Sequence, residues 1–515
     1  MSQVWNEGYF TDVGYTYGYF REINPVFQRF CLLTRGFAAP TATASSSHCE
    51  LGFGQGVSVS VHATATPGEF VGTDFNPAHA AHANGLAIAG GSGAKLYDDS
   101  FEQLLNRHDL PQFDSISLHG IWTWVSRENH RIIAEFVRRQ LKPGGTLYIS
   151  YNCFPGWSPA YPLRQLFALH DRFGNTPNGP IERVEAALKF SERLLNAKPG
   201  YLAAAPQLKD KLEQISKQNK HYLAHEYFNR EWNCMYFTDV VDALAPAKVD
   251  FACTAVPLDG VDAVNLSSEA IEMLNSIDHP VLREQARDYF VNQQFRKDLF
   301  VRGAIRITPL EQRELLLATR FVLLKHETEV SLKVSGAAGE AVLQETVYKP
   351  ILNALADKQY APKKLRELCA KMPDGVTYPQ IQQAIVVLVH MGAVAPCQEE
   401  WAEKDVRKRC AQLNKHLCER ALVGSDVEVL ASPVLGGGLP IGRFPQLFIL
   451  AQQQGKKTAA ELVQFGWGAL SALGQRLVKE GKTLETDAEN IAEITVQAEV
   501  FLTKQLPILK ALQIV

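Results

Sequence analysis

Residues 50–56 read ELGFGQG and decide the fold, because an acidic side chain stands two residues before three glycines at alternate positions. Glycines in this pattern let the backbone of a loop approach a bound ligand closely. The dinucleotide-binding pattern GxGxxG is not met, since Val57 stands three residues after Gly54, where that pattern needs a glycine. The motif predicts a ligand-binding loop built from Glu50, Gly52, Gly54 and Gly56.

The chain after this loop alternates between short strand-like runs and helix-like stretches up to about residue 155. The strand-like runs are GEFVGTDF, AKLYDD, FDSISLHGIW and GTLYISYN, and residues 127–141, RENHRIIAEFVRRQL, are typical of a helix. This order predicts βαβ units and a parallel sheet. The segment before the loop, TATASSSHCELGF, is more polar than a buried parallel strand is expected to be.

Polar side chains stand where these strands end, at the edge where open α/β sheets bind their ligands. Asp74 closes the second strand and could accept hydrogen bonds from two ribose hydroxyls. Asp99 and Ser100 follow the third strand, where they could orient an adenine amino group beside Phe101, and His119 follows the fourth. The order of these elements fits the ExGxGxG loop of class I S-adenosylmethionine-dependent methyltransferases.

The chain resembles those class I methyltransferases that carry a methyltransferase regulatory domain. The resemblance covers about residues 7–330 through TDFNP, DLPQFDSISLHGIWTWV and RRQLKPGGTLYISYNCFPGW, and through two segments typical of the regulatory domain, at 221–244 and 283–303. Well-known members are similar to rickettsial-type protein-lysine methyltransferases of outer-membrane proteins. The resemblance implies S-adenosylmethionine as cofactor and a lysine side chain of an outer-membrane or surface protein as acceptor. The residues expected to bind the cofactor are Glu50, Gly52, Gly54, Gly56, Asp74, Phe75, Asp99, Ser100 and His119.

An amine acceptor needs a dry aromatic pocket, because methyl transfer requires the deprotonated amine. The predicted catalytic residues are Trp122 after the fourth strand, Tyr151 and Asn152 at the end of the fifth, and Tyr17 in the N-terminal stretch YFTDVGYTYGYF. That stretch, with Asp12, Tyr15 and Tyr19, could cover the cofactor as a lid. The alternative for each ring is ordinary core packing.

The resemblance and the periodicities together give the predicted architecture. The fold class is α/β: a Rossmann-like class I methyltransferase domain with a mostly parallel seven-stranded sheet, then mainly helical regulatory and C-terminal domains. The predicted ranges are 1–170 for the cofactor-binding domain, 171–217 for a helical linker, 218–334 for the regulatory-type domain, 335–400 for a winged-helix-like module and 401–515 for a helical C-terminal domain.

The amino-acid composition limits the kinds of molecule that the protein is expected to bind. The 515 residues carry 52 Lys plus Arg against 55 Asp plus Glu, a net charge of −3 that argues against a protein that grips nucleic acid. Residues 376–396 of the winged-helix-like module contain no Lys or Arg, which argues against DNA reading there. The start shows no export signal and no run long enough for membrane insertion, and no CxxC pair occurs. We therefore expect a cytoplasmic protein with a protein substrate, and a homodimer is an open alternative to a monomer.

Two alternatives to protein methylation stay open at this level. The acceptor could be a small molecule or a surface glycan, or the chain could bind the cofactor as a regulatory protein without turnover. His221 and His225 have the i, i+4 spacing of metal ligands, but no third ligand is evident, and we predict no metal site.

Overall fold

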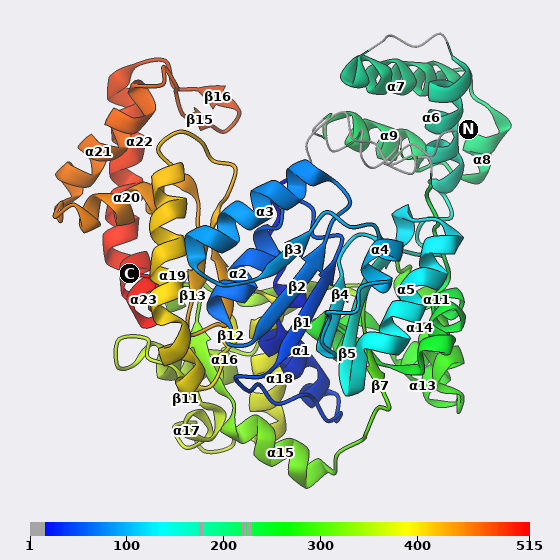
Figure 1. Cartoon of the computed structure of the whole chain (residues 1–515), viewed down its shortest axis with the longest axis horizontal. Helices are drawn as coiled ribbons and strands as arrows, with labels where there is room; N and C mark the ends of the chain where they lie inside the picture. Colours follow the sequence, from blue (N-terminus) through cyan, green and yellow to red (C-terminus); the bar gives the residue numbers. More distant parts are fainter. Residues whose placement is uncertain (1–15, 175–178, 219, 221–222, 224–228, 230) are drawn as a thin grey trace.

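The computed structural model describes residues 16–174, 179–218, 220, 223, 229 and 231–515. Its centre is a seven-stranded sheet in the order β3-β2-β1-β4-β5-β7-β6 (Figure 1). The first five strands are parallel to one another, whereas β7 runs antiparallel to both β5 and β6. This sheet confirms the predicted mostly parallel α/β fold. Its strands are β1 (Ser47–Leu51), β2 (Glu69–Thr73), β3 (Lys95–Tyr97), β4 (Phe113–Leu118), β5 (Leu141–Asn152), β6 (Val249–Thr254) and β7 (Phe295–Arg302).

Strand β1 is fully buried although it begins with polar residues. Its polar side chains bond to the neighbouring part of the sheet: the Ser47 hydroxyl donates to the Gln112 carbonyl at 2.6 Å, and His48 Nδ1 lies 2.8 Å from Ser115 Oγ. A buried polar group costs little once its hydrogen bond is made. The polar start of the segment is therefore compatible with a central strand.

Alternate residues of the strands enter two different cores. Tyr148 of β5 and Leu299 of β7 pack with helices α1 (Pro25–Thr34) and α2 (Val57–Ala65) on one face. Ile149 and Phe300 pack on the other face with α5 (Arg127–Gln140) and α11 (Phe237–Leu244). This alternation is the period of two expected of a strand that is buried on both faces. Two more helices follow β2 and β3, namely α3 (Pro77–Gly90) and α4 (Phe101–Leu105).

The sheet is completed from beyond the predicted domain of residues 1–170. That range holds five of the seven strands, and β6 and β7 come from the range predicted as regulatory. A helical insertion with an apolar core of its own lies between β5 and β6 and extends to the upper right of Figure 1. Besides α11, the helices described between β5 and β7 are α6 (Tyr161–Phe173), α7 (Pro180–Asn196), α8 (Gly200–Ala204), α9 (Leu208–Ser216), then α12 (Asp262–Asn265), α13 (Ser268–Asn275) and α14 (Pro280–Val291).

The chain after β7 first forms a small α/β module. Its three-stranded antiparallel sheet has the order β11-β8-β12 and is packed by helices, and the winged-helix-like module stays a prediction. The central strand β8 comes from before residue 335, where the module was predicted to begin. The elements are α15 (Pro309–Ala318), β8 (Arg320–Leu323), β9 (Lys333–Gly336), β10 (Gly339–Val342), α16 (Glu345–Ala356), β11 (Lys363–Lys364), α17 (Leu365–Cys369), α18 (Tyr378–His390) and β12 (Val394–Pro396).

The last part of the chain is helical around a hairpin. Strands β13 (Val429–Ser432) and β14 (Gly437–Pro440) form that hairpin where the sequence shows only a glycine-rich break. None of the helices in the described ranges combines the length and apolarity that crossing a bilayer requires. The other elements here are α19 (Glu400–Arg420), α20 (Arg443–Gln453), α21 (Ala459–Ser471), β15 (Val478–Lys479), β16 (Lys482–Thr483), α22 (Asp487–Val500), a π-turn (Phe501–Gln505) and α23 (Leu506–Ala511).

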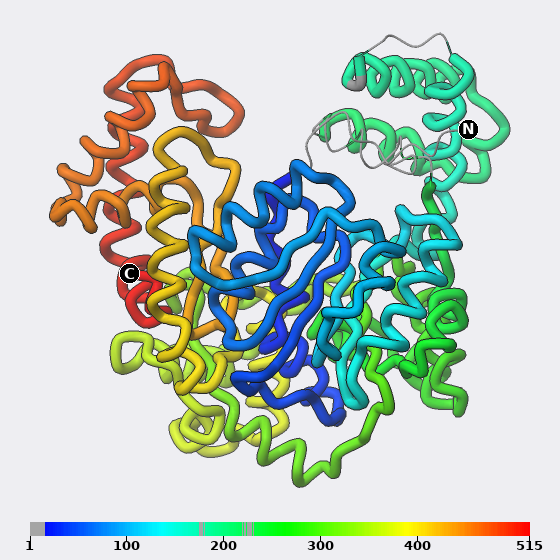
Figure 2. Tube along the Cα trace, in the orientation of Figure 1, coloured from blue at the N-terminus to red at the C-terminus, as the bar shows by residue number. Residues whose placement is uncertain are grey.

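The hairpin β13–β14 lies against α2 and the N-terminal segment, far from it in sequence (Figure 2). The Asn24 amide donates to the carbonyls of Leu435 and Gly436 at 3.2 and 3.1 Å, and the Thr66 hydroxyl donates to Gly436 at 2.7 Å. The Gly438 N–H donates to the Tyr19 hydroxyl at 2.7 Å. The C-terminal part therefore belongs to the same core as one face of the sheet.

We expect Asn24→Ala to lower the free energy of unfolding by about 2–3 kcal/mol. The change removes the N-cap of α1, where Asn24 accepts from the Val26 N–H at 2.7 Å, worth about 1 kcal/mol, and leaves two hairpin carbonyls without their donor. Urea denaturation measures the loss. Asn24→Ser keeps a capping oxygen and should lose about 1 kcal/mol less. Equal stabilities of both variants and wild type would show that this contact does not hold the hairpin.

Candidate functional site

A cavity lies at the carboxyl ends of β1, β2, β3 and β4, beside the glycine loop. Eight of the nine residues predicted to bind a cofactor line it, and the ninth, Gly56, begins α2 just behind it. The structure therefore brings together residues from four strand ends that are far apart in the sequence. The eight are Glu50, Gly52, Gly54, Asp74, Phe75, Asp99, Ser100 and His119.

The glycine loop needs backbone angles that other residues rarely adopt. Gly52, Gly54 and Gly56 have φ of 71°, 57° and 72°. A Cβ on Gly56 would stand 2.2 Å from the Cβ of Ala83 in α3, so this glycine allows two helices to pack closely. The Gly54 N–H donates to Asp74 Oδ2 at 2.8 Å, which joins the loop to the end of β2.

Two buried carboxyl groups face this cavity. Glu50 and Asp74 are 8% and 7% exposed, and no lysine or arginine pairs with either of them in the described part of the chain. Asp74 Oδ1 accepts from the Asn76 N–H and lies 3.1 Å from His79 Nδ1. Burial, with a further contribution from the charge of Asp74, raises the pKa of Glu50 to about 8. A cavity with this acidic pair suits a cationic ligand.

An ion pair and a helix cap hold the residues that follow β3 in place. Asp99 accepts from Arg107 Nε at 2.5 Å, and the guanidinium lies over the Tyr97 ring at 3.6 Å. Ser100 caps α4, with its hydroxyl accepting from the Gln103 N–H at 3.2 Å. These contacts fix the backbone at the end of the cavity that Phe101 and Ser126 line.

Phe20 and His119 separate this cavity from a second, larger one. Their rings are stacked with centroids 3.7 Å apart, and both residues line both cavities. His119 Nδ1 lies 2.9 Å from the Tyr148 hydroxyl, and burial lowers the pKa of His119 to about 4, so the ring is neutral at pH 7. The Phe20 N–H donates to Ser58 Oγ of α2 at 2.9 Å. The aromatic pair forms a shared wall held from both sides.

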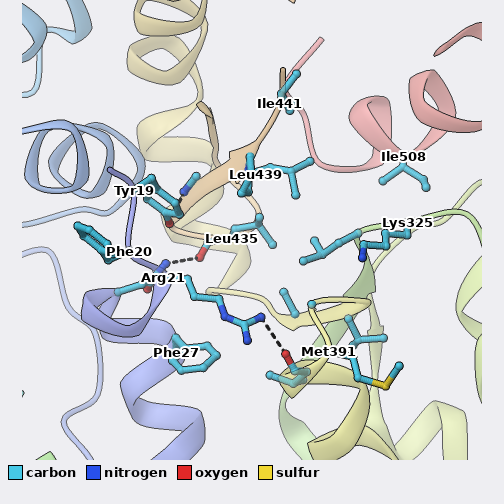
Figure 3. A pocket seen from close by; sticks show the side chains of 18 of the residues that line it. Tyr19, Phe20, Arg21, Phe27, Lys325, Met391, Leu435, Leu439, Ile441 and Ile508 are labelled. Atoms are coloured by element: carbon cyan, nitrogen blue, oxygen red, sulfur yellow. Dashed lines mark hydrogen bonds between the residues drawn. The ribbon is translucent and has the colours of Figure 1, made fainter. Parts of the chain in front are cut away.

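The larger cavity has a volume of about 840 Å³ and is shown in Figure 3. It lies between the N-terminal segment, the first residues of β7, the small α/β module that follows β7, β14 and α23. Its lining includes apolar side chains such as Phe27, Met391, Leu439 and Ile508. Cavities of this size and lining are typical of ligand sites.

None of the four residues predicted to be catalytic lines either cavity. Trp122 is fully buried and stacks on His130 at 4.1 Å, and the Asn152 side chain accepts from Trp157 Nε1 at 3.2 Å. Tyr17 contacts the edge of His82 and lies near Arg420. Trp122, Tyr151 and Asn152 are buried in the layers that cover the sheet, whereas Tyr17 is half-buried in the N-terminal segment. Tyr19, named with the lid, bonds to the hairpin, and Asp12 and Tyr15 lie outside the described residues.

Tyr151 takes part in a buried ionic cluster on β7. Its hydroxyl donates to Asp298 at 2.7 Å, and Arg296 pairs with Asp298 at 2.8 Å, with Asp288 at 2.5 Å and with Glu284 at 2.7 Å. Arg296 is 2% exposed. Three carboxyl groups thus share one guanidinium inside the protein, and burial raises the pKa of Asp288 to about 7.

Sequence reasoning did not select several residues that line the cofactor-side cavity. Phe20 and His79 are clear cases, with Asn129 and Glu231 at the far end. His79 follows the strand-end acid Asp74 by five residues, a position in the first turn of α3 that could have drawn attention. Phe20 and Glu231 come from segments that only the tertiary fold brings to the sheet edge.

Metal ligands do not cluster in the described residues. No group of three or more His, Cys, Asp or Glu side chains there is placed to hold a metal ion. The pair His221 and His225 lies outside the described residues.

Two family models match the chain. Residues 49–149 match the model described as a methyltransferase domain, and residues 219–302 match the predicted methyltransferase regulatory domain. The second range contains β6 and β7, so the region matched as regulatory supplies two strands of the central sheet.

The chain also has one relative that matches it over its full length and others that match part of it. The uncharacterized protein sll1526 of Synechocystis sp. is 40% identical over 515 residues, which cover 99% of this chain and 100% of the relative. The uncharacterized protein RP789 of Rickettsia prowazekii is 26% identical over 53% of this chain and 48% of its own. The structure of PKMT2 from Rickettsia typhi in complex with AdoHcy covers 96% of this chain and 98% of that chain with a TM-score of 0.66 and 18% identity. This likeness shows a shared fold.

The ionic cluster predicts a pH dependence of stability. Because the pKa of Asp288 is about 7 in the folded protein and near 3.8 when unfolded, the folded state holds the proton over this interval and the unfolded state does not. Stability should therefore fall as pH rises from about 4 to 7. Asp288→Asn should flatten this slope in urea denaturation at several pH values. An unchanged slope would place the titrating group elsewhere.

Proposed function

This chain belongs to the class I S-adenosylmethionine-dependent methyltransferases that carry a methyltransferase regulatory domain, and we propose that it methylates lysine side chains of a protein. The observation that carries the proposal is the pair of adjoining cavities. One holds the predicted cofactor residues, and the other is larger, is lined by both apolar and charged side chains, and lies behind the wall of Phe20 and His119.

We assign the smaller cavity to the cofactor. S-adenosylmethionine supplies an electrophilic methyl group on a positively charged sulfur. Asp74 is placed to accept hydrogen bonds from its ribose, and Asp99 and Ser100 mark the adenine end. No lysine or arginine pairs with Glu50 or Asp74 in the described part of the chain, and a cationic cofactor would supply the missing positive charge. Gly52 and Gly54 let the loop backbone lie against the ligand.

A lysine acceptor must lose its proton before it can attack the methyl group. At an unperturbed pKa of about 10.4, deprotonation at pH 7 costs about 4.6 kcal/mol. Burial lowers the pKa of an amine, because a low-dielectric environment disfavours the charged form. The larger cavity provides such an environment beside Phe20, Phe295 and Leu439. The neutral His119 ring adds no further positive charge, and the cations of Arg21 and Lys325 elsewhere in this cavity also lower the pKa of an incoming amine.

We place the acceptor route through the larger cavity and past the aromatic wall. Phe20 is joined to α2 through its backbone N–H, and its ring is held by stacking on His119. A modest movement of this ring would connect the two cavities and align amine, methyl group and sulfur for in-line displacement. The N-terminal segment thus serves as a wall of the active site, close to the predicted role of a lid. The homodimer, the cytoplasmic location and the outer-membrane or surface acceptor stay predictions.

The proposal is tested by incubating the purified protein with S-adenosylmethionine labelled in its methyl group and with fractionated bacterial protein, including outer-membrane protein. We expect label in protein, and mass spectrometry of digests should place it on lysine as added methyl groups. Asp74→Ala is the control, because loss of two charge-assisted hydrogen bonds should weaken cofactor binding about 100-fold or more and abolish labelling. Label confined to small molecules or glycans, or cofactor binding without turnover, would contradict a protein substrate.

Cofactor affinity should rise with pH below 7.5. Glu50, with a pKa of about 8, is protonated at pH 6 in the free protein, and a bound cation favours its charged form, so binding releases a proton. We expect the dissociation constant of S-adenosylmethionine to fall by up to about tenfold per pH unit between pH 6 and 7.5. Calorimetry measures the affinity and, in buffers of different ionisation enthalpy, the proton release. Glu50→Gln should remove both effects, and their persistence would assign the proton to another group.

A further inference from the structure

We propose that the larger cavity selects acceptor segments that carry a carboxylate close to the methylated lysine, and that Arg21 and Lys325 recognise this carboxylate. The inference deepens the proposed function and rests on it. Arg21 belongs to the short 3₁₀ helix Arg21–Ile23, and Lys325 follows β8. The two side chains enter the cavity from different sides (Figure 3).

The cavity contains more positive than negative charge. Its carboxylates are those of Glu22 and Glu329, and each is already paired: Glu22 with Lys297 at 2.6 Å and Glu329 with Lys504 at 2.8 Å. Arg21 and Lys325 have no carboxylate partner in the part of the chain that the structure describes. Two cations thus remain for a ligand, and no free carboxylate competes for them.

Arg21 is held in place by backbone carbonyls alone. Its Nη1 donates to Val389 at 2.9 Å and its Nη2 to His390 at 2.7 Å, at the end of α18, and its guanidinium lies 5.1 Å from the centre of the Phe27 ring. These neutral partners fix the side chain without cancelling its charge. A guanidinium held in this way is a pre-organised site for a carboxylate.

Lys325 is an exposed side chain with no hydrogen bond or ion pair in the described structure. Its flexible stem can follow a ligand, and the interaction of its charge with a carboxylate will weaken with salt. It can be changed with little expected cost to the fold, since no neighbour depends on it. Lys325 is therefore the residue on which specificity is best tested.

The remaining lining favours a peptide segment over a small polar anion. Apolar side chains surround the two cations, among them Leu435, Leu439 and Ile508. The edge strands β12 and β14 also line the cavity, and edge strands are where extended peptides add to a sheet. An acidic and apolar segment around the lysine matches both properties.

The test uses three fluorescent nine-residue peptides, each with one central lysine among apolar residues. The peptides differ only at the two positions that flank the lysine, which are both aspartate, both asparagine or both arginine. Fluorescence anisotropy measures their binding to full-length protein saturated with S-adenosylhomocysteine. We expect the aspartate peptide to bind about tenfold more tightly than the arginine peptide at low salt, with the difference shrinking as salt rises. Lys325→Glu should weaken binding of the aspartate peptide about five- to tenfold.

The matched control is Lys482→Glu, which makes the same charge change at an exposed lysine in β16, outside the cavity, and should leave binding unchanged. Lys325→Met should lie between wild type and Lys325→Glu. Equal affinity for the three peptides overturns the inference, and so does unchanged peptide binding by the Lys325→Glu variant. The inference also fails if the protein binds dodecanoate, an apolar chain with one carboxylate, through Lys325 but binds none of the peptides. Selective binding of the aspartate peptide with no methyl transfer to lysine, in peptide or protein, would instead remove the proposed function.

Discussion

Helix α2 is buried on every side, and the rest of the structure depends on how that burial is achieved. All nine residues from Val57 to Ala65 are buried, and four of them are polar. Each polar side chain has a partner: Ser58 with the Phe20 N–H, Ser60 with the Ala83 carbonyl, His62 with the Tyr19 hydroxyl and Thr64 with the Ser60 carbonyl. The helix that begins at the glycine loop therefore requires α3, the N-terminal segment and the C-terminal hairpin to surround it.

The motifs found in the sequence were sufficient for the sheet and the cofactor-side cavity, because both depend on local patterns. Glu50, Asp74 and Asp99 each stand at a strand end, and parallel strands bring their carboxyl ends to one edge whatever else the chain does. The residues VSVSVHATA alternate as a strand would, yet they form a helix, since burial on all sides removes the usual amphipathic period.

The residues predicted to be catalytic do not line either cavity, because the direction of such side chains depends on distant partners. Tyr151 looked suited to a cavity, but it turns toward Asp298 on β7, and the pairing of β5 with β7 could not be read from the strand patterns alone. Similarly, Phe20 became part of the site only because the hairpin and α2 fix Tyr19 and Phe20. Strands β6 and β7 show the same effect on a larger scale, because they complete the sheet from a region whose sequence suggested a separate domain.

The contact between Thr66 and Gly436 spans 370 residues, and this has a consequence for how the protein is made. At about 5–20 residues per second, the ribosome needs roughly 20 to 70 seconds after α2 emerges to deliver the hairpin that covers it. During that time the side of α2 that packs on the hairpin lacks its cover. The cofactor site is thus completed only near the end of translation, and a nascent chain that stops early has no finished wall beside its glycine loop.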